Sequence, residues 1–157
     1  LEANLAAWGS AIRPVCAALS SSEGELEFLS EGADAGRLAD AGEPSDSAGA
    51  RKVSVRAVKL SSYLDRPVDL LKLDVEGAEM EVIREIAPKL PNVRRIFVEA
   101  HSFCGRPQDY GELIHLLQDS GFRCNVEVAS SQWEGLRQLV GSSDMDLNLN
   151  IYGTRRE

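Results

Sequence analysis

The sequence contains few cysteines, no long apolar run and no excess of positive charge, and each absence argues against a class of protein. Three cysteines, none in C-x-x-C spacing, do not suggest a disulfide framework or a zinc site. No stretch approaches the roughly 18 apolar residues of a transmembrane helix. The 17 basic and 25 acidic residues give a net charge of −8, which argues against binding to nucleic acid or to an anionic membrane surface.

The start of the chain lacks two further features. No signal-peptide pattern opens it, and together with the odd number of cysteines this predicts a reducing, cytoplasmic location. The first residue is Leu1 instead of methionine, and residues 1–9 have the pattern of a helix that ends at Gly9. We therefore expect the sequence to begin inside its domain. Its 157 residues are enough for one domain with its own core.

Apolar patterns along the chain predict a domain of α/β class. Strands are expected at residues 12–20, 24–30, 52–60, 68–75, 94–101, 122–128 and 147–153, and helices at 78–90, 108–120 and 131–141. Crossover helices in the middle of the chain predict a mostly parallel sheet. The last two strands alternate cleanly and are expected to form an antiparallel ribbon at its edge.

Residues 31–51 contain almost no bulky apolar side chain and consist mainly of Gly, Ala, Ser and Asp. This composition predicts a long flexible loop inside one domain, because the patterns on both sides need each other to form a sheet. A tolerated surface insertion and a lid over a site are both compatible with such a loop.

Acidic residues follow the strand expected at 68–75, whose dense apolar pattern is typical of a strand covered on both faces. In an open parallel sheet, ligands bind beyond the carboxyl ends of the strands. Two consecutive strands deliver four candidate side chains to this rim, and they are Asp74, Glu76, Glu99 and His101. Gly77 suits the tight turn that follows, because it has no side chain to block a close approach.

The acids beside Gly77 also have a structural explanation. Carboxylates in the first turn of a helix stabilise its dipole by about 0.3–1 kcal/mol and cap its free N–H groups, and Glu76 and Glu79 fit this description. Asp74 is expected to lie deeper, where a charge without a partner is costly, which favours a functional role. His101 alone is a weak signal, since the backbone can satisfy a histidine at a strand end.

The stretch VDLLKLDVEGAEMEVIRE, residues 68–85, resembles the signature of the FkbM family of S-adenosylmethionine-dependent methyltransferases. The family pattern D-x-[LIV]-K-[LIV]-D-[VI]-E-G-x-E is matched here by Asp69, Lys72, Asp74, Glu76, Gly77 and Glu79. Further segments resemble the family in the correct order, and they are LEANLAAWG, VCAALSSSEGELEF, LSSYLD and IFVEAH. The resemblance therefore covers most of the chain.

The resemblance implies a Rossmann-like class I methyltransferase fold that is truncated at its N-terminus. No G-x-G-x-x-G occurs in the chain, so the glycine-rich cofactor turn of such a fold is expected upstream of Leu1. It also implies S-adenosylmethionine as the cofactor and a hydroxyl of a small molecule, sugar or lipid as the methyl acceptor.

Roles for individual residues follow from the same resemblance. Asp74 is implied to lie beside the methyl group of the cofactor, and Ala17 and Ala18 are implied to border its adenine. The acceptor side is implied to be shaped by Glu76, Glu99 and His101. His101 or Asp74 is the candidate general base for the acceptor hydroxyl.

Two other functions stay open at this point. The four rim side chains, Asp74, Glu76, Glu99 and His101, could bind Mg²⁺ or Mn²⁺ in a metal-dependent hydrolase. The domain could also be a non-catalytic remnant, with the acids acting only as helix caps. We assign no metal site from the sequence, and it predicts neither the identity of the acceptor nor the oligomeric state.

Overall fold

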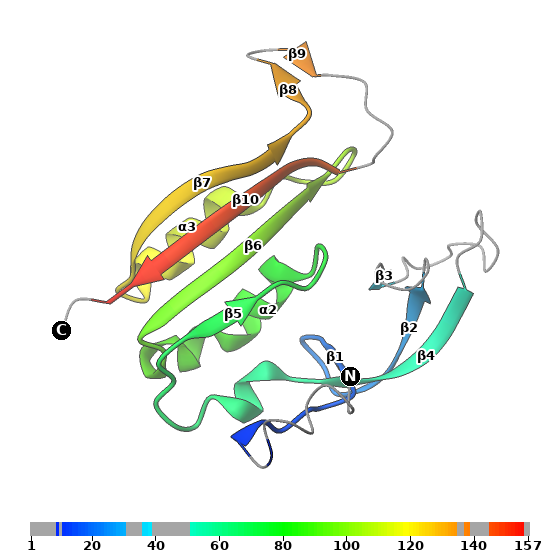
Figure 1. Cartoon of the computed structure of the whole chain (residues 1–157), viewed down its shortest axis with the longest axis vertical. Coiled ribbons are helices and arrows are strands. Elements are labelled where there is room, and N and C mark those ends of the chain that lie inside the picture. The colour runs from blue at the N-terminus through cyan, green and yellow to red at the C-terminus, as the bar shows by residue number, and fades with distance from the viewer. Residues whose placement is uncertain are drawn as a thin grey trace.

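The structure, a computed structural model, describes residues 9, 11–30, 36–38, 51–134, 137–138 and 145–155. The main strands form two sheets (Figure 1). The first has the order β1 (Ala18–Leu19), β4 (Arg51–Val58), β2 (Gly24–Ser30) and β3 (Gly36–Leu38). The second has the order β5 (Leu71–Leu73), β6 (Arg95–Phe103), β10 (Met145–Thr154) and β7 (Arg123–Ser131). With two α-helices, α2 (Glu79–Ile86) and α3 (Tyr110–Asp119), the structure has the expected α/β class.

The last two strands form the antiparallel ribbon that was predicted at the edge of the second sheet. β5 and β6 pair in parallel, and β10 runs antiparallel to both β6 and β7, so β5, β6 and β7 point the same way. Within the ribbon, β10 lies inside the sheet and β7 forms its edge. β10 presents Leu149 and Ile151 to the core, which explains its central place.

The described strands do not form the mostly parallel sheet that was predicted. The β1–β4 and β5–β6 ladders are parallel, whereas the other five ladders are antiparallel. In the first sheet β2 pairs antiparallel with β4 and β3, because no crossover helix separates these strands. β3 lies within residues 31–51, where only a loop was expected. The rest of that range lies outside the described residues, as does the helix expected at 1–9 apart from Gly9.

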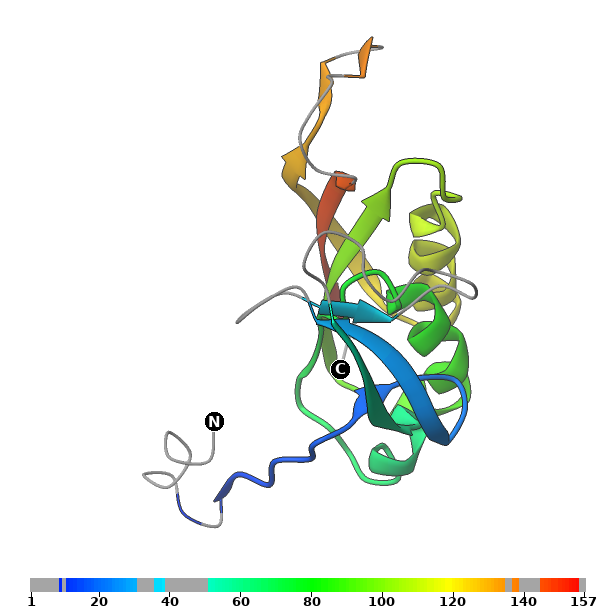
Figure 2. The same ribbon diagram turned by 90° about the vertical axis from the view of Figure 1, so that its right-hand side faces the viewer.

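Both helices pack on one face of the second sheet (Figure 2). The buried residues of α2, α3 and the strands form one apolar core, and they include Val82, Ile83, Ile86, Leu113, Leu117, Ile96, Val98 and Ile151. Alternate residues of β6, namely Ile96, Val98 and Ala100, are buried in this core. Glu99 and His101 therefore point from β6 to the opposite face of the sheet.

The predicted helices at 78–90 and 108–120 are confirmed, with shorter α-helical parts. α2 ends at Ile86 and continues as the 3₁₀ helix η3 (Ala87–Asn92), because Pro88 and Pro91 lack the N–H groups that an α-helix needs. Another 3₁₀ helix, η2 (Leu60–Tyr63), precedes β5. No helix in the described part of the chain combines the length and apolar character needed to cross a membrane.

Three predicted elements are wrong or too long. The strand expected at 12–20 is reduced to β1, since Pro14 interrupts the pattern. The strand expected at 68–75 is reduced to β5, and Leu70 is 60% exposed, so this segment is not covered on both faces. In place of a helix at 131–141, β8 (Trp133–Glu134) pairs with β9 (Arg137–Gln138). Gly135 between them disfavours a helix interior.

Candidate functional site

The turn between β5 and α2 is closed by a buried carboxylate. Glu79 Oε1 accepts hydrogen bonds from the Val75 N–H at 3.2 Å and the Gly77 N–H at 3.0 Å. The Glu79 side chain is only 4% exposed. Two residues of this turn have positive φ, 52° at Glu76 and 99° at Gly77. These angles turn the chain back so that the Glu79 carboxylate lies within hydrogen-bond distance of the backbone of the turn.

The same carboxylate binds the histidine at the end of β6. His101 Nδ1 lies 2.9 Å from Glu79 Oε1, and the His101 side chain is 5% exposed. Because an ionised carboxylate only accepts hydrogen bonds, Nδ1 must carry a proton and donate it. This contact assigns the proton of a neutral imidazole to Nδ1 and leaves the lone pair on Nε2.

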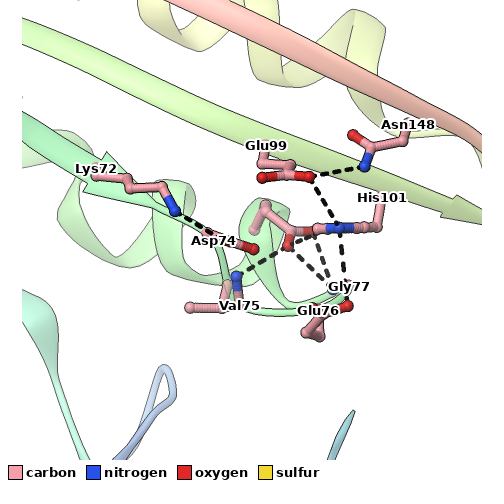
Figure 3. Close-up of polar contacts among 9 residues, drawn as sticks. Lys72, Asp74, Val75, Glu76, Gly77, Glu99, His101 and Asn148 are labelled. Atoms are coloured by element: carbon pink, nitrogen blue, oxygen red, sulfur yellow. Dashed lines mark hydrogen bonds and ion pairs between the residues drawn. The ribbon is translucent and has the colours of Figure 1, made fainter. Parts of the chain in front are cut away.

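The free nitrogen of His101 faces two more carboxylates. Nε2 lies 3.7 Å from Glu76 Oε2 and 3.9 Å from Glu99 Oε1, beyond hydrogen-bond length but within ion-pair range (Figure 3). The pKa of His101 is raised, first by the hydrogen bond to Glu79 and further by the negative charges of Glu79, Glu76 and Glu99, while burial opposes the rise. The site therefore favours a protonated imidazole.

This raised pKa predicts a pH dependence of stability. Because the folded-state pKa lies above that of the unfolded chain, the imidazolium stabilises the fold fully below about pH 6.5, and the gain is lost as pH rises through the folded pKa. We expect the free energy of unfolding, from urea titrations, to fall over this window. The decrease should vanish in His101→Gln and persist in His115→Gln, whose imidazole is 71% exposed. An equal decrease of the free energy of unfolding with pH in all three proteins would show that His101 is not its cause.

Glu99 is held in place by the strand that lies next to β6. Asn148 of β10 stands opposite His101 in the ladder, and its Nδ2 donates to Glu99 Oε1 at 2.9 Å. Asn148 is only 7% exposed. It lies on the inner strand β10, between β6 and β7.

Asp74 lies at the outer side of the rim. Its carboxylate pairs with Lys72 Nζ at 2.8 Å and is 30% exposed, so the expected deep burial of this charge is wrong. One ligand atom each from Asp74, Glu76 and His101 lie within 4.8 Å of one another. The three atoms are therefore close enough together to bind one metal ion, as the metal-dependent alternative requires. However, Lys72 already supplies a positive charge to Asp74.

The structure thus brings Asp74, Glu76, Glu99 and His101 together on one rim, and their catalytic roles stay predictions. Ala18 lies in β1 of the first sheet and Ala17 immediately before it, and both are half-buried and not among the side chains around His101. The turn after β1 is linked to α2, since Glu81 accepts hydrogen bonds from Ser20 Oγ at 3.1 Å and the Ser21 N–H at 2.6 Å.

A cavity of about 340 Å³ opens beside the Glu79–His101 pair. It lies at the carboxyl end of β6, between the first turns of α2 and α3, and Ser102, Phe103 and Tyr110 line its other walls. Its size falls at the lower end of the roughly 300–1,000 Å³ of small-molecule sites. Glu79 and His101 are among the residues that line it, whereas Glu76 and Glu99 are not.

Glu79 is the functional candidate that the sequence reasoning missed, because helix capping explained it well enough. It does bind backbone N–H groups, but its charge also orients His101. The signal that points to it is the second acid of the E-G-x-E pattern, which capping alone does not require.

Comparison with known proteins gives one family. The family model described as the Methyltransferase FkbM domain matches residues 7–124, which include the β5–α2 turn and His101. No curated protein and no solved structure matches the chain.

Proposed function

This chain belongs to the family of FkbM methyltransferase domains, and from that membership we propose that it transfers a methyl group from S-adenosylmethionine to a hydroxyl of a small molecule, sugar or lipid. The observation that carries the proposal is the buried Glu79–His101 pair, which fixes a proton on Nδ1 and leaves Nε2 as a basic nitrogen at the acidic rim. The common direction of β5, β6 and β7 supports the finer proposal of a Rossmann-like fold.

His101 acts as the general base in this proposal. Its neutral form carries a proton on Nδ1, so Nε2 accepts the proton of the acceptor hydroxyl as the oxygen forms its new bond to the methyl carbon. Glu79 then lies 2.9 Å from the resulting imidazolium and stabilises its charge. The cofactor, when bound, supplies an electrophilic methyl group on a sulfonium.

The charges on the rim fit the cationic end of the cofactor. Asp74, Glu76 and Glu99 present carboxylates around His101, and such groups attract a sulfonium or an ammonium. Asp74 lies at the outer side of the rim, next to Lys72, and is proposed to face the cofactor. Ala17 and Ala18 are proposed to border the adenine, on the family resemblance alone.

The test begins with cofactor binding and not with an unidentified acceptor. Calorimetry with S-adenosylmethionine should show one site, and Asp74→Asn should weaken binding by about tenfold, as expected for the loss of one charge contact of about 1.4 kcal/mol. Glu112→Asn is the matched control, because Glu112 is exposed and pairs with Arg84 on the outer surface of the helices. An affinity that is unchanged in Asp74→Asn would overturn the role proposed for this carboxylate.

Methyl transfer is then measured as release of S-adenosylhomocysteine with sugars, polyols and hydroxylated lipids as acceptors. The proposal expects turnover that depends on His101 and survives a chelator. Hydrolytic activity that needs no S-adenosylmethionine and is abolished by the chelator would favour the metal-dependent alternative. Cofactor binding without turnover of any acceptor would favour the alternative that the domain is not catalytic.

A further inference from the structure

β7 is a nine-residue edge strand with no partner on its outer side among the described residues, as Figure 1 shows at the margin of the second sheet. Natural edge strands are usually short, or carry lysine, proline or a bulge that prevents pairing with another chain. The sequence of β7, RCNVEVASS, contains neither lysine nor proline. Its only irregularity faces the step between Asn148 and Leu149 of β10, so residues 123–128 remain regular.

The outer surface of this edge has apolar side chains on one face. Val126 is 41% exposed and Val128 is 64% exposed, and both stand beside the core residues of β10 in the ladder. Isolated exposed valines are ordinary, but two on the same face of an unpaired strand offer a surface that a further strand would cover.

The opposite face of β7 carries two charges of opposite sign. Arg123 and Glu127 share this face with Asn125, since all three alternate with Cys124 and Val126. Neither charge has an ion-pair partner in the described part of the chain, and Glu127 accepts only the Asn125 amide at 3.3 Å. Both charges are therefore available to another strand.

These charges are self-complementary in one register. When two copies of β7 pair antiparallel with Asn125 opposite Asn125 of the second copy, Arg123 of each copy stands opposite Glu127 of the other. Opposite charges directly across an antiparallel pair are favourable, and like charges are unfavourable. On the other face the same register places Val126 of each copy opposite Cys124.

We propose that β7 pairs with β7 of a second copy of this chain, forming an antiparallel two-fold dimer with one continuous sheet of eight strands and two Arg123–Glu127 pairs across the interface. A single strand pair buries less than the roughly 1,200–2,000 Å² of a stable interface, so the dimer is weak and depends on protein concentration. The rim with His101 belongs to β5 and β6, so the dimer leaves the candidate site open.

The first test is sedimentation velocity of the full chain over a concentration series from about 1 µM to 1 mM, a range that covers weak protein association. We expect a monomer–dimer equilibrium, and Glu127→Arg should raise the dimer dissociation constant by about tenfold or more, because it replaces two attractive pairs by two repulsive ones. The double variant Arg123→Glu with Glu127→Arg should restore the dimer dissociation constant of the wild type. Glu23→Arg, an exposed position outside β7, changes the net charge equally and should leave the dimer unchanged.

The register has its own test. With the exposed Cys16 and Cys104 replaced by serine, Asn125→Cys should form an intermolecular disulfide rapidly, because the two cysteines would face each other across the dimer axis. Glu127→Cys is the control, since this position faces Arg123 of the second copy and not itself. A chain that stays monomeric at the highest concentration, or a dimer that ignores all charge changes in β7, would overturn the proposal.

Discussion

Replacing Glu79 by glutamine is expected to lower kcat for methyl transfer by about 10²–10³-fold, the usual cost of removing one group that stabilises charge in the transition state. Glutamine has almost the same shape, and its amide oxygen can still accept the Val75 and Gly77 N–H groups. The same oxygen position, Oε1, also contacts His101 Nδ1, so the neutral ring keeps its proton on Nδ1. What is lost is the negative charge beside the ring, so the pKa of His101 falls and the imidazolium that forms during the reaction is less well stabilised.

Two measurements separate this positioning role from a loss of structure. The ¹⁵N shifts of the His101 ring report its protonation directly, and we expect the pKa of His101 to fall in Glu79→Gln while the neutral ring keeps its proton on Nδ1. This readout needs no substrate, so it holds even if the reaction is not methyl transfer. Glu112→Gln removes an exposed carboxylate from the neighbouring helix and should change neither the pKa of His101 nor kcat. A variant Glu79→Gln in which both kcat and the pKa of His101 are unchanged would refute the role of the pair.

Replacing Gly77 by alanine is expected to reduce the free energy of unfolding by about 2–5 kcal/mol, the sum of two separate costs. The φ of Gly77 is 99°, a conformation that is unfavourable for any residue with a Cβ atom. A Cβ at this position would also lie 2.7 Å from Cε2 of Phe103, too close for an ordinary contact. Urea unfolding measures the total cost.

Control variants divide this cost into its parts. Gly105 has a φ of 79°, and a Cβ added there would meet nothing within 4 Å, so Gly105→Ala carries only the cost of the backbone angle. Gly77→Ala should therefore lose more stability than Gly105→Ala. The difference should shrink when Phe103 is also replaced by leucine, because the ring edge is then gone. Equal losses of stability in both alanine variants would show that the Phe103 ring moves aside at no cost in free energy.

Much of the scaffold around the site follows from local patterns. The apolar positions Val82, Ile83 and Ile86 at helical spacing predict the buried face of α2, and all three are at most 1% exposed. The alternation in RRIFVEAH predicts β6 and brings Glu99 and His101 to its carboxyl end. Since β5 and β6 are parallel neighbours, the meeting of their end residues on one rim was predictable.

The orientation of Glu79 was not predictable, because it depends on an uncommon backbone angle. Glu76 has a φ of 52°, and a positive φ at a residue other than glycine leaves no local sequence signal. Similarly, the burial of Asn148 follows from the insertion of β10 between β6 and β7, which is a tertiary pairing. The alternation of Asn148 and Asn150 with apolar residues indicates only that they share a face.

The polar contacts of α2 connect segments at very different separations along the chain, and this has a consequence for folding kinetics. Glu79 reaches Val75 four residues away and His101 22 residues away, whereas Glu81 of the same helix reaches Ser20 61 residues away. Long loops cost more entropy to close, and distant contacts slow folding. We expect β5, α2 and β6 to gain protection from hydrogen exchange early, with β1 joining them later. The candidate site would then be assembled before the first sheet is attached to it.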